Sequence, residues 1–449
     1  MSYIEKVEID GLFGRFDYTI DLTGDKGGLS ILTAPNGFGK STILRIIESF
    51  SNGDFWYFLK EDFTAIRFFI SGENEVEIKH KDQGKSIVVS NGDKETVIDD
   101  PFDDNSDDLR SFAVERALPF LSRIGPRTWR HDSTGEILDR VEIISRYRDH
   151  PIFRRKNRRE AWIEKIISSL RVFSITTNRL KNDVEINERN GNTRKDSFMV
   201  SHIAENIKDQ IRLAIRNQFE EGRKKETSFP TRLMEALKNQ NPPSKTSVLE
   251  SINALQLLEE RYGRLGIIPN TEATKQLNMH LDSTESTGLL VLKTYLDDIM
   301  EKFSLLDNLS QRLDVFCSSV NQLLSFKEII TSADDGIVVK MTDGDRRNIN
   351  LTGLSSGEQH LLVLLGRLIF DTRRGSLVLI DEPEISFHPE WQECFIEILN
   401  EVKKLNGFNV MLATHSPILI GDNYWGNVIE LADQYQVPET TPSFKDMDI

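Results

Sequence analysis

A glycine-rich run near the N-terminus carries the clearest chemistry in this chain. It reads Ala34-Pro35-Asn36-Gly37-Phe38-Gly39-Lys40-Ser41-Thr42 and lies between the apolar segments 29–33 and 43–47. This order predicts a strand, a tight loop and a helix, with loop and helix N–H groups facing phosphate oxygens. Lys40 can then reach the β- and γ-phosphates of a nucleotide, and the Ser41 hydroxyl can ligate Mg²⁺.

We therefore expect ATP to contact the residues that run from this loop into the helix. They are Asn36, Gly37, Phe38, Gly39, Lys40, Ser41 and Thr42. Ala34 occupies the position of the usual first glycine. Its methyl group is tolerable if the backbone angle φ of this residue stays negative.

Two carboxylates follow a second apolar segment late in the chain. Residues 377–380 are Leu-Val-Leu-Ile, and Asp381 and Glu382 come directly after them. Continuous apolar runs suit a strand that is buried on both faces. At the end of such a strand, Asp381 is placed to hold the Mg²⁺ shell and Glu382 to polarise an attacking water. An acidic pair alone is a weak signal, but after a phosphate-binding loop it indicates hydrolysis of a nucleoside triphosphate.

A serine–glycine turn lies between these two motifs in the sequence. It reads Leu354-Ser355-Ser356-Gly357-Glu358-Gln359 and precedes an apolar helix. Ser355 or Ser356 can cap that helix, and Gly357 allows a phosphate to approach its backbone. The alternative is a plain helix cap with a glutamate nearby. Taken by itself, the turn favours that alternative.

A histidine follows the last predicted buried strand, residues 409–413. The sequence at its end is Ala413-Thr414-His415-Ser416-Pro417. A histidine in this position is commonly structural. Beside the other motifs, we interpret His415 as a residue that contacts the γ-phosphate and positions water. Lys40, Glu382 and His415 are therefore the expected catalytic residues.

Taken together, these four motifs resemble the motif set of ABC-type ATPases. In that family the serine–glycine turn is the signature, which contacts the γ-phosphate held by the opposing subunit, and the histidine is the switch histidine. The resemblance implies ATP and Mg²⁺ as ligands. It also implies a head-to-tail homodimer, or a higher homo-oligomer, with two ATP molecules between the heads. The residues expected to act in trans are Ser355, Ser356, Gly357 and Glu358.

A longer block narrows the resemblance, and it reads Asp381-Glu382-Pro383-Glu384-Ile385-Ser386-Phe387-His388-Pro389-Glu390-Trp391. It is similar to the block of SMC-like, RecF-like and overcoming-lysogenisation-defect ATPases, in which Ser386 and His388 would fall in a loop that crosses between protomers. A Toprim nuclease follows the head in the last of these families, and the short stretch after His415 leads us to expect none here. The chain thus resembles the ATPase subunits of the Septu and PARIS phage-defence systems, whose nuclease or toxin is a separate polypeptide.

This resemblance implies an ATP hydrolase that senses infection and controls a separate nuclease or toxin effector. One alternative is a RecF/SMC-like DNA repair or maintenance ATPase that clamps DNA. Another is a scaffold that binds ATP and barely hydrolyses it. The long segment between the phosphate-binding loop and the signature argues against a transporter ATPase.

Three weaker candidates accompany the motifs. Arg15 is either a turn residue or, as the resemblance implies, a nucleotide contact. The segment 172–180 looks like a strand that ends in polar residues, and Asn178 or Arg179 would replace the glutamine of the family's Q-loop. A basic cluster is either a solvated helix face or a site for DNA phosphates or an acidic partner. Its members are Arg146, Arg148, Arg154, Arg155, Lys156, Arg158 and Arg159.

The elements that must position these motifs fall into three zones. Residues 1–110 hold short alternating strands around the phosphate-binding loop and form the first ATPase lobe. Residues 111–330 are mostly helical and form an arm or a partner-docking insertion. Residues 331–449 return to an α/β pattern and form the second lobe. The expected fold class is α/β: an ABC-type P-loop ATPase head with a mixed sheet, interrupted by a helical or coiled-coil insertion.

The helical zone has one extended apolar pattern. Apolar residues at spacings of three and four run from Leu289 to Leu323, with one early step at Leu309. This pattern predicts a heptad-like stripe with a local phase shift. It belongs either to an ordinary bundle core or to an antiparallel arm. The helical pattern breaks around 239–244, which indicates a loop or the tip of the arm.

Composition sets limits on the class of protein. The formal net charge of −15 argues against a protein coated in nucleic acid, although a local patch can still bind DNA. Cys317 and Cys394 match no metal-ligand spacing. The N-terminal residues lack the apolar core of a signal peptide, and there is no apolar run of about 18 residues. We therefore expect a cytoplasmic protein that does not enter a membrane.

Overall fold

The computed structural model describes residues 2–23, 27–73, 75–99, 115, 118–125, 128–132, 135–139, 142–143, 147, 160–175, 199–238, 242–269, 285–343, 347–385 and 387–435. The chain divides into two compact units, each built from separate stretches. Unit 1 comprises Met1–Thr177, Arg373–Glu384 and Gly407–Ile449, and unit 2 comprises Asn178–Thr372 and Ile385–Asn406.

A parallel sheet forms the centre of unit 1. Its strands lie in the order β11 (Val172–Ile175), β15 (Leu377–Asp381), β16 (Asn409–Thr414), β3 (Leu29–Thr33) and β17 (Val428–Glu430). Neighbouring strands are all parallel. Apolar runs such as Leu-Val-Leu-Ile in β15 suit this sheet, because central parallel strands are buried on both faces.

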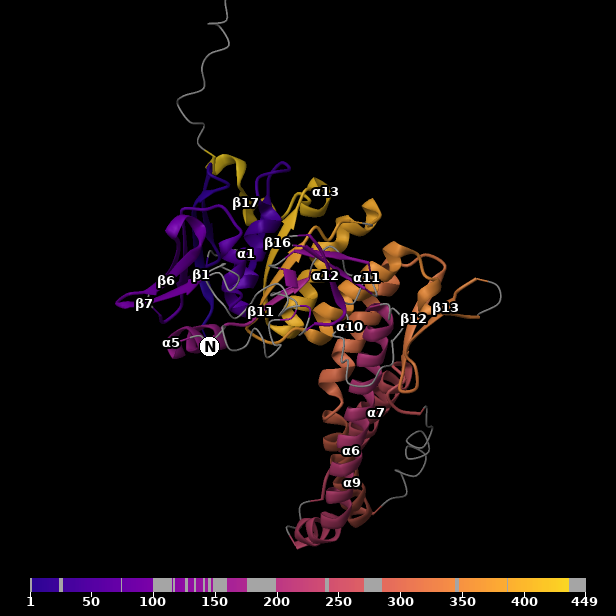
Figure 1. Cartoon of the computed structure of the whole chain (residues 1–449). Helices are drawn as coiled ribbons and strands as arrows, with labels where there is room; N and C mark the ends of the chain where they lie inside the picture. The colour runs from indigo at the N-terminus through magenta and orange to yellow at the C-terminus, as the bar shows by residue number, and fades with distance from the viewer. Residues whose placement is uncertain are drawn as a thin grey trace, which may run out of the picture. The chain divides into compact units, whose positions relative to one another are not determined.

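An antiparallel sheet forms a second layer of unit 1 (Figure 1). Its order is β2 (Phe16–Asp21), β1 (Ile4–Leu12), β4 (Ala65–Ile70), β5 (Val76–Lys81), β6 (Ser86–Asn91) and β7 (Lys94–Asp99). Burial alternates strictly along β2, so one face of this sheet is turned to the core. The predicted strands thus divide into one parallel and one antiparallel sheet.

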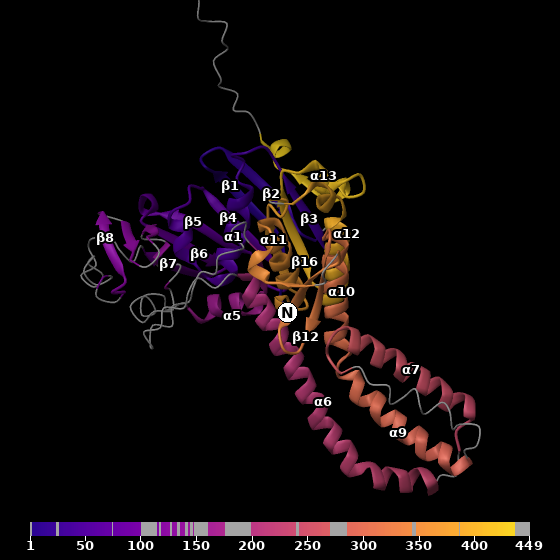
Figure 2. The ribbon, with the colours of Figure 1, turned by 90° about the vertical axis from the view of Figure 1, so that its right-hand side faces the viewer.

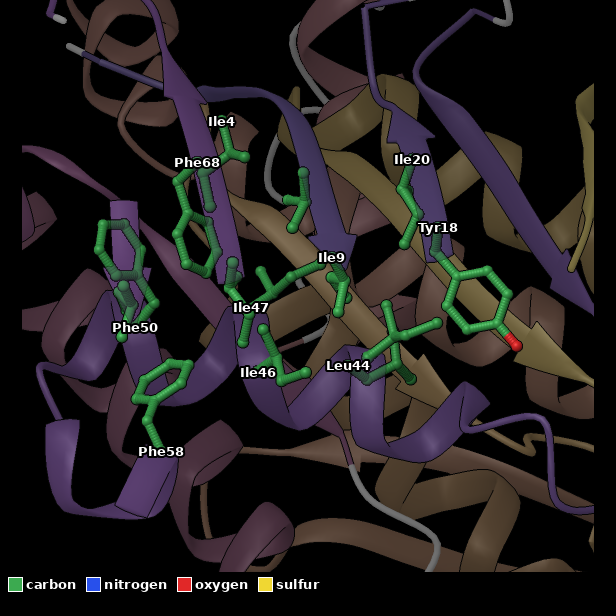
Figure 3. Close-up of a cluster of buried hydrophobic side chains, with 14 of the residues drawn as sticks. Ile4, Ile9, Tyr18, Ile20, Leu44, Ile46, Ile47, Phe50, Phe58 and Phe68 are labelled. Carbon is green, nitrogen blue, oxygen red and sulfur yellow. The ribbon is translucent and has the colours of Figure 1, made fainter. Parts of the chain in front are cut away.

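Helix α1 (Lys40–Asn52) packs against both sheets of unit 1. Its Ile46, Ile47 and Phe50 belong to one buried cluster with residues of both sheets. Figure 3 shows these three side chains together with Ile9 and Phe68 of the antiparallel sheet. The Phe50 ring stacks on Phe68 of β4 at a centroid distance of 3.9 Å. The helix that follows the phosphate-binding loop is therefore held on two sides by apolar packing.

Unit 1 also contains short elements that the sequence pattern did not predict. Strands β8 (Leu121–Gly125), β9 (Thr128–His131) and β10 (Ile137–Asp139) form a small antiparallel sheet. Trp129 is buried at its centre. Helix α5 (Ala161–Ser169) precedes β11, and α13 (Pro417–Ile420) follows β16.

Unit 2 is mainly helical. Helices α6 (Met199–Lys238), α7 (Lys245–Arg264) and α9 (Ser286–Ser304) run alongside one another (Figure 2). Helices α7 and α9 share an apolar core that includes Ile252 and Leu296. Helix α6 contacts α9 through charged pairs, among them Lys302 with Glu226 at 3.2 Å.

The remaining elements of unit 2 include the helix behind the serine–glycine turn. They are α10 (Asp307–Leu323), β12 (Lys327–Ser332), β13 (Gly336–Met341), β14 (Asn348–Ile349), α11 (Ser356–Gly366) and α12 (Pro389–Asn406). The predicted apolar stripe is split between α9 and α10, which meet just before the phase step at Leu309. The structure confirms the α/β class with a helical insertion. None of the helices in the described stretches has both the length and the apolar character to cross a membrane.

Candidate nucleotide-binding site

Three strands of the parallel sheet bring the predicted motifs of unit 1 to one edge. In the sheet register Asp381 lies beside Ala413, and Thr414 lies beside Thr33, so the carboxyl ends of β15, β16 and β3 are level. Strand β16 lies between the other two. His415 therefore follows a strand that is flanked by the phosphate-binding loop on one side and the acidic pair on the other.

The phosphate-binding loop has the backbone that its glycines permit. Gly37 and Gly39 have φ of 88° and 84°, whereas Ala34 is outside the set of residues with positive φ. A Cβ atom at Gly39 would lie 3.1 Å from Leu12 Cδ2 and 3.2 Å from a ring carbon of Phe13. The glycine at 39 is thus needed for both its conformation and its lack of a side chain, and the alanine at 34 is accommodated as expected.

Lys40 is buried at the start of α1, with 5% of its surface exposed. Its Nζ donates a hydrogen bond to the Ala34 carbonyl oxygen at 2.8 Å and lies 2.6 Å from His415 Nε2. Burial lowers the pKa of the Lys40 ammonium, and the carboxylates of Glu382, Asp381, Glu384 and Glu430 oppose that shift. A buried cation in this position suits a ligand that carries several negative charges.

Ser41 and Asp381, the two residues expected to hold Mg²⁺, lie side by side. The Ser41 hydroxyl donates to Asp381 Oδ1 at 3.0 Å. Burial raises the pKa of the Asp381 carboxyl, and the Ser41 hydrogen bond counteracts the rise. No group of three or more His, Cys, Asp or Glu side chains within the described ranges could hold a metal by itself. The pair fits Mg²⁺, which commonly takes one or two protein oxygens together with water and substrate phosphates.

Glu382 has a strained backbone. Its φ is 44°, a left-handed value that is uncommon for a non-glycine residue. Its N–H donates to the Ala413 carbonyl oxygen at 2.9 Å, and its Oε1 lies 3.7 Å from His415 Nε2. The Glu382 carboxylate therefore lies beside the histidine.

Glu384 links two strand ends of the site, a role that its sequence position did not predict. Its Oε1 accepts hydrogen bonds from the Thr414 hydroxyl at 2.7 Å and from the His415 N–H at 2.8 Å. Glu384 thereby joins the segment after β15 to the end of β16. The only signal in the sequence was its place in the acidic block after the strand, because the strand pairing that makes the contact is not local.

Arg15 lies in the exposed turn between β1 and β2. Its guanidinium is 5.7 Å from the centroid of the Phe16 ring. The Phe16 ring lies 5.2 Å from the ring of Phe38 in the phosphate-binding loop. The turn that carries Arg15 is therefore adjacent to the loop, and a contact between Arg15 and nucleotide remains a prediction.

The serine–glycine turn lies in unit 2 and forms a complete helix cap. Ser355 Oγ accepts from the Glu358 N–H at 3.3 Å, and Glu358 Oε2 accepts from the Ser355 N–H at 2.8 Å. Lys327 donates to both oxygens of Glu358, at 2.7 and 2.9 Å. Ser355 and Ser356 are exposed and Glu358 is buried. The cap interpretation is thus observed directly, and the contact of this turn with a partner's nucleotide remains a prediction.

Several predicted positions lie outside the described residues. They are Asn178, Arg179, Ser386 and the whole basic cluster between Arg146 and Arg159.

Comparisons with known proteins match most of the chain to one family model. The model AAA_15, an AAA ATPase domain, matches residues 3–420. Protein ea59 of Escherichia phage lambda is 34% identical over 70 residues, a stretch that covers 16% of this chain and 13% of ea59. The chain therefore spans only a small part of that relative.

Solved structures of Smc heads also align with the chain. One is the Smc head domain with an extended coiled coil bound to the C-terminal domain of ScpA, derived from Pyrococcus furiosus. It is 13% identical to this chain, and the alignment covers 96% of this chain and 93% of the Smc chain, with a TM-score of 0.34. Another is the Smc head domain with a coiled coil and joint derived from Pyrococcus yayanosii, with 13% identity, coverages of 96% and 95%, and a TM-score of 0.32.

Proposed function

The chain belongs to the AAA_15 family of AAA ATPase domains, and from this premise we propose that it is a Mg²⁺-dependent ATP hydrolase of the ABC type. One observation carries the proposal. Lys40, the Ser41–Asp381 pair, Glu382 and His415 meet at the carboxyl edge of one parallel sheet, where α/β sheets bind ligands.

Each residue of this edge has a distinct part in the proposed reaction. The Lys40 ammonium offsets the charge of the β- and γ-phosphates of the substrate ATP. Ser41 and Asp381 would hold Mg²⁺, which when bound neutralises charge on the phosphates. Glu382 orients and polarises the attacking water, and His415 lies beside it to hold that water and the γ-phosphate in line.

The proposed active unit is a head-to-tail homodimer or a higher homo-oligomer. In it, Ser355, Ser356, Gly357 and Glu358 of one subunit would meet the γ-phosphate held by the other. The exposure of Ser355 and Ser356 at the start of α11 supports this part. The N–H groups at a helix N-terminus favour an anion.

We further propose that nucleotide-driven closure controls a separate effector, a nuclease or a toxin, in a phage-defence system. Two features support this proposal. The sequence block from Asp381 to Trp391 resembles that of overcoming-lysogenisation-defect ATPases as well as SMC-like and RecF-like ones, and α6, α7 and α9 provide an extended helical surface for a partner. The alternative is a RecF/SMC-like ATPase that clamps DNA. Tight, salt-sensitive and ATP-dependent binding of duplex DNA would favour the alternative. Co-purification of a nuclease or toxin would favour the first proposal.

The enzymatic proposal is tested with the Glu382→Gln variant. Because this change keeps the shape of the side chain and removes its charge, we expect kcat for ATP to fall about 10²- to 10⁴-fold. In the presence of ATP and Mg²⁺, the variant protein should then accumulate as a closed oligomer. Light scattering detects this oligomer as an increase in mass. Lys40→Ala, which weakens nucleotide binding, is the control that should stay unassembled. Normal hydrolysis by Glu382→Gln would contradict the assigned role, and an unchanged mass would contradict the sandwich.

A further inference from the structure

A polar cavity lies at the edge of the parallel sheet opposite the proposed nucleotide site. Its volume is about 290 Å³, and its walls include the first residues of β11, β15 and β16, namely Val172, Leu377 and Asn409. Strand β15 runs from this cavity to Asp381 at the other edge. With about 3.3 Å per residue, a group bound here would be roughly 13 Å or more from the catalytic carboxylates.

The cavity wall combines apolar side chains, such as Leu22 and Val410, with polar residues and one arginine. Ser30 and Ser376 line it, although each residue is only 5% exposed. Arg171 and Asn409 also line the cavity. The described residues of the wall include no carboxylate. The positive charge of Arg171 in this wall favours an anionic occupant.

Two more arginines precede β15 at the same edge. The Arg171 Nη1 donates to the Arg374 carbonyl oxygen at 3.4 Å. The Arg374 stem packs over Gly407, whose hypothetical Cβ would lie 3.1 Å from Arg374 Cγ. In the part of the chain that the structure describes, Arg171, Arg373 and Arg374 form no ion pair with a carboxylate. Of the three, Arg171 alone is among the residues that line the cavity, so it is the arginine expected to contact a ligand there.

We propose that this cavity binds the phosphate group of a small molecule, as a site separate from the proposed ATP site. A guanidinium matches phosphate oxygens with two parallel N–H donors, and serine hydroxyls complete the set of donors. The volume is at the lower end of ligand pockets, about 300–1,000 Å³, and therefore suits a free phosphate or a small phosphate ester. The proposal does not depend on hydrolysis at the opposite edge.

The test uses the full chain carrying Lys40→Ala, so that phosphate binding at the nucleotide site is weakened. Inorganic phosphate and AMP are the two probes, and ³¹P NMR line broadening measures their dissociation constants. We expect broadening with Lys40→Ala alone. Adding Arg171→Gln should weaken binding about tenfold or more, because a charge-assisted contact is lost. The two probes distinguish a site for free phosphate from a site for a phosphate ester.

Arg373→Gln is the matched control, since it removes the same charge from the same edge but does not line the cavity. It should change the dissociation constant less than about threefold. Arg171→Lys keeps the charge but loses the pair of parallel N–H donors, so its dissociation constant should lie between those of the Arg171→Gln and Arg373→Gln proteins. This variant also keeps the test valid if Arg171→Gln does not fold. The proposal is overturned by an absence of broadening, by equal effects of the Arg171 and Arg373 changes, or by displacement of phosphate by a short DNA duplex in every variant.

Discussion

At the scale of single residues, the site depends on contacts between side chains that are far apart in sequence. Lys40 meets His415, and Glu384 accepts hydrogen bonds from both Thr414 and the His415 backbone. The sequence alone could single out positions 40, 381, 382 and 415 as candidate site residues, because each lies in a local motif. The role of Glu384 was not, because it arises only when β15 and β16 are paired.

Glu384 is a positioning residue, and its role predicts a split in kinetic constants. Glu384→Ala removes the acceptor for Thr414 and His415, so kcat should fall about tenfold with KM for ATP within about twofold. Glu384→Gln keeps an acceptor oxygen and should recover most of kcat. Steady-state kinetics of both variants decide the matter. Equal losses would show that the charge of Glu384 matters and that its hydrogen bonds do not.

Two glycines of the phosphate-binding loop offer a matched pair of substitutions. Gly37→Ala meets only the conformational cost of a positive φ, about 1–2 kcal/mol, because nothing lies within 4 Å of its hypothetical Cβ. Gly39→Ala meets that cost and a close contact with Leu12 and Phe13, which adds roughly 1 kcal/mol or more. In urea unfolding, the Gly39→Ala protein should therefore have a lower free energy of unfolding than the Gly37→Ala protein. The reverse order would contradict the packing described for the turn between β1 and β2.

At the scale of elements, the sequence predicted the features that depend on neighbouring residues, such as the bounds of a buried strand and the break between two helices. The strand at 29–33 has the predicted bounds, because its apolar residues indicate both its burial and its length. The phase step in the apolar stripe has a structural cause, because α9 ends at Ser304 and α10 begins at Asp307. Strands β8 to β10 escaped prediction because each is short and none has a sustained alternation of apolar and polar residues.

The cap of α11 predicts a pH-dependent contribution to stability. Burial by itself would raise the pKa of the Glu358 carboxyl, but hydrogen bonds from Lys327 and Ser355 hold it below its usual value. A carboxylate with a lowered pKa in the folded state stabilises the fold above its unfolded pKa, and this contribution is lost as the pH falls through the folded pKa.

Glu358→Gln should therefore lower the free energy of unfolding by about 1 kcal/mol at pH 7 and by progressively less below about pH 4.5. Denaturant unfolding across this range measures the difference. Glu328→Gln, at an exposed position of β12, is the control that should show no such trend. A difference that stays constant down to pH 3 would contradict the ion pair with Lys327.

At the scale of the whole molecule, the proposed signature and the proposed catalytic residues belong to different units. Lys40, Asp381 and His415 are in unit 1, and Ser356 is in unit 2. Sequence order predicted that a helical segment separates the loop from the signature. The assembly of unit 1 from three separate stretches needed the strand pairing that only the structure gives.

The proposed dimer predicts a specific block to assembly. Ser356→Arg, introduced into the Glu382→Gln background, places a bulky side chain where the partner's phosphates would lie and should prevent the ATP-dependent increase in mass. Ser318→Arg is the matched control, because Ser318 is also exposed on a helix of unit 2. Analytical ultracentrifugation with and without ATP compares them. Assembly of the Ser356→Arg protein would exclude this turn from the interface.

The position of β3 also has a consequence for biosynthesis. Its two neighbours in the sheet are β16 and β17, which begin only at Asn409 and Val428 and are therefore translated long after β3. At about 5–20 residues per second, the nascent β3 waits on the order of tens of seconds with both of its edges unpaired. Such an apolar strand is prone to join other chains. The yield of native protein should accordingly rise with chaperone supply and fall when ribosomes stall before codon 409.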